Sequence, residues 1–145
     1  MSEKTSTQSV ETIAGATMGR GYRHVPAAEG IIGAAIDVHK ILGRGFVEAV
    51  YHNALCIELH DRGIEFDKEV DIPVIYRDVE VGLHRLDILI PDQLVVELKA
   101  VKTVERVHMM FVRSYLRATG LADGLILNFS KPILEIRRVG GNVAI

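Results

Sequence analysis

The clearest chemistry in this sequence lies in two acidic residues and a lysine, Asp87, Glu97 and Lys99. The residues around them read as two short apolar strands, Leu83–Ile90 and Leu94–Val101, joined by turn-forming residues. Side chains alternate along a strand, so pairing across the turn places Asp87 opposite Glu97, with Lys99 projecting from the same face. The pattern therefore predicts a hairpin that carries all three charged groups on one face.

The other face of this predicted hairpin is almost entirely apolar. It consists of Leu86, Ile88, Ile90, Leu94, Val96, Leu98 and Ala100. Two carboxylates that face each other across a ladder, with Cβ atoms ~5 Å apart, repel unless something lies between them. A divalent cation with oxygen ligands would fit there, and Lys99 could then meet a phosphate oxygen or an attacking water. The pattern alone leaves open the alternative that this face is only the wet side of a ribbon.

Composition describes an ordinary globular protein of one domain. The chain has 145 residues, of which 48% are hydrophobic and 25% charged. A net charge of −2 argues against a general polyanion binder, and a single cysteine, Cys56, excludes an internal disulfide or a thiolate cluster. No apolar run is long enough to span a bilayer and no secretion signal is recognisable, so we expect a cytoplasmic protein without a membrane partner.

The chain order predicts an α/β fold, with a flexible N-terminal leader over residues 1–26 and one domain over residues 27–145. The expected helices are Ala27–Leu42, Phe46–Arg62 and Thr103–Thr119; besides the hairpin, the expected strands are Ile64–Lys68, Val70–Tyr76, Leu125–Phe129 and Ile133–Val139. This order, α-α-β-β-β-β-α-β-β, indicates one mixed central β-sheet flanked by helices. An exposed sheet edge could pair two copies, so a homodimer is left open.

Two of these helices carry further candidate residues. Glu48 lies in the first turn of the second helix, at the border of its apolar stripe. The helix dipole favours an acid there, and a carboxylate that leans toward a core needs a partner, so both interpretations stay open. The third helix has an apolar stripe made of Val104, Val107, Phe111, Tyr115 and Ala118, which predicts its buried face.

Two motifs together resemble a known family. The segment GFVEAVY, from Gly45 to Tyr51, fits the signature GxxExxY, and Asp87 with the tripeptide Glu97-Leu98-Lys99 fits the pattern D…ExK. With the strand VELKAV leading into a helix, these motifs resemble the GxxExxY protein family, a small branch of the PD-(D/E)xK nuclease-like superfamily. The resemblance runs from about residue 31 to residue 139.

The resemblance implies a restriction-endonuclease-like (PD-(D/E)xK) core in which the hairpin lines a cleft. Active members of the superfamily bind Mg²⁺ and hydrolyse phosphodiester bonds, so Mg²⁺ (or Mn²⁺) is the implied cofactor and nucleic acid, expected to be DNA, the implied partner. Carried over residue by residue, Asp87 and Glu97 would be metal ligands and the backbone carbonyl of Leu98 a further oxygen. Glu48 would be another ligand or would hold a metal-bound water, and Lys99 would orient the nucleophile.

The third helix departs from the pattern of related nucleases. They often carry a glutamine four residues before a tyrosine on this helix, whereas here Phe111 stands four residues before Tyr115. His108, one turn earlier, could supply a polar group instead, so Tyr115 and His108 are candidates for positioning the substrate. The departure supports an alternative function, a catalytically weak or inactive relative that binds nucleic acid or a protein partner.

Overall fold

A five-stranded mixed sheet, in the order β1-β2-β3-β4-β5, forms the centre of the molecule. The structure is a computed structural model and describes residues 25–140, so the leader predicted over residues 1–26 lies outside the described residues up to residue 24. The elements are α2 (Pro26–Leu42), α3 (Glu48–Asp61), β1 (Asp67–Tyr76), β2 (Val79–Ile90), β3 (Leu94–Lys99), α4 (Arg106–Thr119), β4 (Asp123–Asn128) and β5 (Glu135–Gly140). The predicted α/β fold with one mixed sheet and flanking helices is confirmed.

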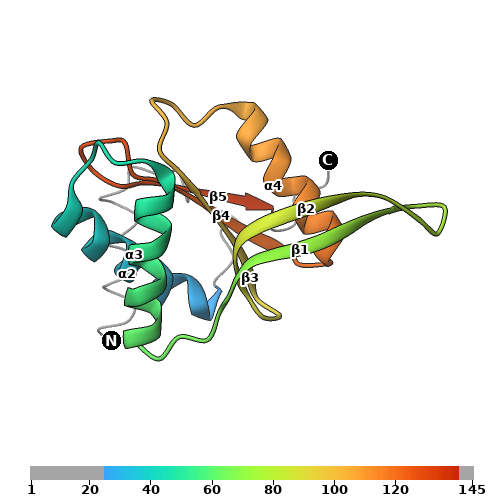
Figure 1. The fold of residues 1–145 in the computed structure, drawn as a ribbon, viewed down its shortest axis with the longest axis horizontal. Coiled ribbons are helices and arrows are strands. Elements are labelled where there is room, and N and C mark those ends of the chain that lie inside the picture. The colour runs from blue at the N-terminus through green and yellow to red at the C-terminus, as the bar shows by residue number, and fades with distance from the viewer. Residues whose placement is uncertain (1–24, 141–145) are drawn as a thin grey trace.

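The helices cover the two faces of the sheet separately. Figure 1 shows α2 and α3 on one side of the sheet and α4 on the other, and two separate clusters of buried side chains lie beneath them. Between these layers β3 and β4 pair in parallel, and almost every residue of both strands is buried. Helix α4 lies close against β4, since a Cβ atom on Gly124 would come within 2.7 Å of a Val112 methyl group. Within residues 25–140 no helix is long and apolar enough to cross a membrane.

The strands before β3 differ from the prediction. The structure has three strands before α4 where the sequence pattern indicates four, because Ile64–Lys68 is not a strand of its own. The backbone N–H of Ile64 bonds to Leu59 at the end of α3, and Ile64 and Phe66 pack against the core, which accounts for their apolar alternation. β1 and β2 are longer than predicted and form a hairpin that projects from the body (Figure 1).

The β2–β3 hairpin has the predicted register, with Ile90 opposite Leu94. The predicted apolar face is wrong at Leu86, which packs with Val95 in the cluster beneath α4. The reason is a local irregularity: the β2–β3 ladder extends only to Ile88, and on the other side Glu69 of β1 adopts a φ of 53°. Strand β2 therefore changes its alternation at Asp87.

The predicted buried stripe of the third helix is also wrong in part. Phe111 is 53% exposed and Val107 is 43% exposed, whereas Val112 and Leu116 make the buried contacts of α4. Because the close approach of α4 to β4 at Gly124 is made through Val112, the neighbouring stripe turns away from the core.

Candidate active site

The two acidic residues of the hairpin lie where β2 and β3 separate. Beyond the pair Ile88–Val96 the backbone ladder ends, and the carboxylates accept hydrogen bonds from the next backbone N–H groups. The backbone N–H of Leu98 donates to Asp87 Oδ2 at 2.8 Å, and the backbone N–H of Asp87 donates to Glu97 Oε1 at 3.1 Å. These bonds fix both carboxylates side by side and leave the second oxygen of each for another partner.

Both carboxylates are short of compensating charge. Glu97 is 6% exposed, and burial, together with the nearby charge of Asp87, raises its pKa to about 8. Burial also raises the pKa of Asp87, against the opposing effects of the Leu98 N–H and the side chains of His52 and Lys99. A pair of desolvated acids with raised pKa values is a site where a cation would be strongly stabilised.

Glu48 enters the same site from the first residue of α3. The residue as a whole is exposed, but its carboxyl group is partly desolvated, and this raises its pKa. Lys99 and the backbone N–H of Ala100 oppose the rise, whereas the charge of Asp87 adds to it. The carboxyl group of Glu48 is therefore close to both the lysine and the hairpin acids.

Tyr51 sets where α3 begins, and so where Glu48 points. Its buried hydroxyl group donates to the carbonyl of Gly43 at 2.7 Å and accepts the backbone N–H of Phe46 at 3.2 Å. Gly43 (φ 70°) and Gly45 (φ 114°) allow the chain to turn sharply between the two helices. The spacing of Gly45, Glu48 and Tyr51 thus has a local structural reason: the tyrosine closes the loop that presents the glutamate.

Lys99 connects the acids. Its ammonium group lowers the pKa values of Glu48, Asp87 and Glu97 through its charge, so it is within electrostatic reach of all three. Its backbone carbonyl accepts the N–H of Phe129, and the Phe129 ring stacks on Tyr51 with ring centres 4.5 Å apart. The two motifs are thus joined through the core as well as through their charges.

Helix α4 supplies the opposite wall. Burial raises the pKa of Tyr115 to about 12, and the charges of Glu97 and Asp87 add to the rise. His108 lowers the pKa of Glu48 through its charge, and its Nδ1 accepts the backbone N–H of Glu105 at 2.9 Å as part of a helix cap. In neutral His108 the proton therefore sits on Nε2.

Two residues that the sequence pattern did not single out hold this site in place. His52 donates its Nε2–H to the backbone carbonyl of Asp87 at 3.0 Å, from the turn of α3 that follows Glu48. Asn128, fully buried, bonds to both the N–H and the carbonyl of Val101, two residues after Lys99. Glu135 accepts the remaining Asn128 N–H at 3.0 Å and so fixes the orientation of the amide. A polar residue that ends the apolar run LILN was the available signal for Asn128.

The donor set fits a hard divalent cation. Within residues 25–140 no three His, Cys, Asp or Glu side chains are arranged as a ready-made metal cluster. Mg²⁺ does not require one, because it typically takes one or two carboxylates and completes its octahedron with waters and substrate phosphate. The second oxygens of Asp87 and Glu97 meet that requirement, and the desolvated negative charge of the pair supports it.

Comparisons with known proteins identify the family and the fold. The family model described as the PD-(D/E)XK nuclease superfamily matches residues 26–139. The solved structure titled "Crystal structure of SSO0001" is similar to this chain, with a TM-score of 0.50 and 15% sequence identity. The similar region covers 67% of this chain and 52% of that one, so the chain spans about half of the other protein, and the likeness is one of fold. No curated protein matches the chain significantly.

Proposed function

Because the chain belongs to the PD-(D/E)XK nuclease superfamily, we propose that it is a metal-dependent nuclease that hydrolyses phosphodiester bonds in nucleic acid. The observation that supports the proposal is the pair Asp87 and Glu97, which backbone N–H groups hold side by side, with Lys99 and Glu48 near enough to act on them through their charges. Acids that hold a cation beside a lysine are suited to a reaction in which negative charge develops on a phosphate.

Each residue has a role in this proposal. Asp87 and Glu97, with the carbonyl oxygen of Leu98, would hold Mg²⁺ or Mn²⁺, which when bound offsets phosphate charge and acidifies a water. Glu48 orients a water or adds a carboxylate ligand. Lys99 steers the attacking oxygen and stabilises the charge on the phosphate.

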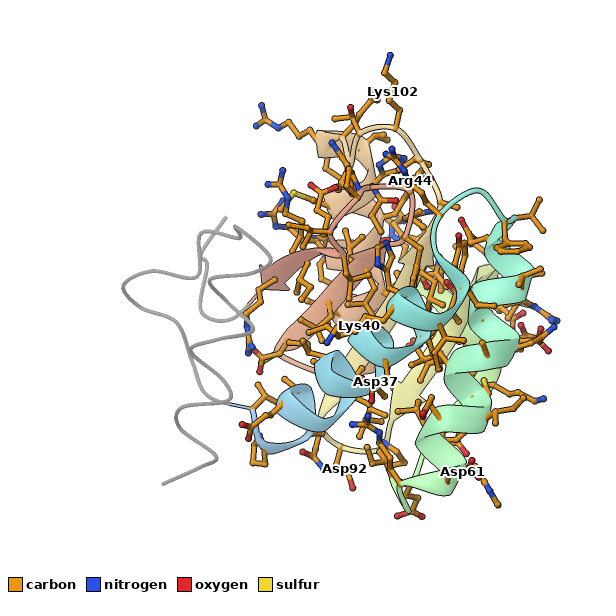
Figure 2. The ribbon with its side chains drawn as sticks, turned by 90° about the vertical axis from the view of Figure 1, so that its left-hand side faces the viewer. Asp37, Lys40, Arg44, Asp61, Asp92 and Lys102 are labelled. Atoms are coloured by element: carbon orange, nitrogen blue, oxygen red, sulfur yellow. The ribbon has the colours of Figure 1, made fainter. Side chains whose placement is uncertain are left out.

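The charge distribution supports a polyanionic substrate, for which DNA is our expectation. Figure 2 shows Arg44 and Lys102 at one end of the molecule, and Asp61 and Asp92 at the opposite end. The cationic end is the one where α3 begins, since Asp61 is the last residue of α3. Despite a net charge of −2, Arg44 and Lys102 thus lie at the end of the molecule where Glu48 begins α3, which would suit the phosphates of a substrate.

A cleavage assay tests the function directly. Purified protein is incubated with linear, circular and single-stranded DNA in Mg²⁺, in Mn²⁺ and in EDTA. We expect metal-dependent cleavage that falls by about 100-fold or more in Asp87→Asn and in Lys99→Met, on the scale of losing a charge-stabilising group. Asp92→Asn, in the exposed β2–β3 turn, and Lys40→Met, on α2, serve as matched controls and should cleave like the wild type. Cleavage that persists in EDTA, or that survives Asp87→Asn, would contradict the proposal.

The exposed Phe111 favours a second candidate function, a binding module without efficient catalysis. In that case the wild type would bind oligonucleotides or a protein but leave DNA intact in every metal.

The homodimer also stays a prediction: β1 and β5 are the edge strands of the sheet, and light scattering would show whether two copies associate.

A further inference from the structure

Phe111 is a large apolar side chain exposed on α4, the helix that also carries His108 and Tyr115. We propose that its ring is a stacking surface for an unpaired base beside the phosphate that is cut, so that the substrate is single-stranded nucleic acid or a strand with unpaired bases at that point. The inference rests on the proposed nuclease function and adds the class of substrate to it.

The position of Phe111 follows from its neighbours on α4. His108, Phe111 and Tyr115 are three and four residues apart, so they lie along one face of the helix. Ser114 and Tyr115, which flank Phe111 around the helix, both contact His84 of β2, the strand that carries Asp87, so this side of α4 faces β2. The charges of Glu97 and Asp87 also raise the pKa of Tyr115. Phe111 is 53% exposed on this side of α4, so an accessible phenyl ring lies on the helix that borders the acids.

Hydrogen bonds hold this turn of α4 against the sheet. The hydroxyl group of Ser114 donates to the backbone carbonyl of Phe111 at 2.6 Å, so it can accept the Nε2–H of His84 at 3.2 Å. The His84 ring also contacts Tyr115 edge to face, with ring centres 4.6 Å apart. The turn that carries Phe111 is therefore anchored to β2, the strand that carries Asp87, and the ring is presented from a fixed support.

The chemistry of the ring selects the ligand. A phenyl ring cannot donate or accept a conventional hydrogen bond, so it cannot position a water or a phosphate, but it stacks on the face of any base. In an intact duplex these faces are covered by neighbouring base pairs. Lys99 is the last residue of β3, and Lys102 follows it three residues later. Their positive charges suit the phosphates of a nucleic acid, which favours a nucleic acid over an apolar protein segment as the ligand.

A binding experiment without catalysis tests the inference. Fluorescence anisotropy in EDTA measures the affinity of the wild type, Phe111→Ala, Phe111→Trp and Met110→Ala for a labelled single strand and for the matching duplex. We expect Phe111→Ala to weaken binding of the single strand about 5- to 150-fold, the range for one stacked base, and Phe111→Trp to retain it. Met110 is 55% exposed and adjacent on the same helix but points about 100° away, so Met110→Ala is the matched control and should bind normally.

The outcomes separate this inference from the proposed function. Oligonucleotides with a single abasic position, moved stepwise along the strand, should include one on which the wild type and Phe111→Ala bind equally. Equal losses for Phe111→Ala and Met110→Ala, or an equal loss on duplex and single strand, would overturn the stacking role. Normal binding and stacking without cleavage in any metal would uphold this inference and refute only the nuclease activity. Metal-dependent cleavage by a wild type and a Phe111→Ala protein that act equally on single strand would overturn this inference and leave the nuclease proposal standing.

Discussion

Asp87 and Glu97 are adjacent acids, one half-buried and the other buried, and their negative charges are not fully compensated by the groups around them. Each accepts one backbone N–H, and Lys99 lies near both, yet burial still raises the pKa of each above its usual value. The residual unfavourable charge is what a cation would neutralise. Because ionising these buried acids costs free energy in the folded protein, its stability should depend on pH.

The raised pKa of Glu97 determines whether stability rises or falls with pH. Its pKa is about 8 in the folded protein and about 4.5 when unfolded, so between these values the folded state binds more protons than the unfolded state. The free energy of unfolding of the metal-free protein should therefore fall as pH rises from about 4.5 to 8, by up to about 5 kcal/mol from this group. Glu97→Gln should remove that part of the dependence and be the more stable protein at pH 8.

Urea unfolding in EDTA at several pH values measures the effect. Glu65→Gln, in the exposed segment before β1, is the control and should keep the wild-type dependence. If Glu97→Gln and the wild type lose stability in parallel across this range, the acid pair is not strained as described here.

At the scale of elements, the site depends on how three segments end. Helix α3 begins at Glu48 because Tyr51 closes the preceding loop, β3 leads into a segment that Asn128 holds, and the β2–β3 ladder stops at the acids. Element ends leave backbone groups without regular partners, and in this protein the side chains of the site fill that role. Loss of one such closure should therefore affect both stability and the site.

Tyr51→Phe tests this link with the removal of one oxygen atom. The carbonyl of Gly43 and the N–H of Phe46 would lose their partner, and we expect unfolding free energy to fall by about 1–3 kcal/mol. Cleavage should fall as well, because Glu48 is no longer presented in one position. Tyr76→Phe changes a tyrosine that is 60% exposed and should alter neither property. A Tyr51→Phe protein as stable as the control would show that the hydroxyl group does not close the loop.

The sequence predicts those parts of the elements that depend on local pattern. The turn after Ile90 determines the hairpin register, so the meeting of Asp87 and Glu97 could be predicted. The orientation of Leu86 could not, because it depends on an irregularity shared with Glu69 on another strand. The stripe through Phe111 has the period of a buried face, but a helix can carry apolar residues toward a ligand site as well as toward a core.

At the scale of the whole molecule, the site lies where both helical layers meet the sheet. Glu48 comes from the layer of α2 and α3, Tyr115 and His108 come from α4, and the hairpin acids lie between them. No local pattern places residues from both layers together. That Glu48 meets the hairpin is implied by the family resemblance and stays a prediction, while the supporting contacts of His52 and Asn128 required the tertiary structure.

The most direct test of the account is a crystal structure of the protein grown with Mn²⁺, whose anomalous scattering locates the ion. We predict one peak between the free carboxylate oxygens of Asp87 and Glu97, at about 2.2 Å from each, and its absence from crystals of Asp87→Asn grown in the same way. Crystals that contain Mn²⁺ but show no peak between these two acids, or the same peak in Asp87→Asn, would contradict the central claim.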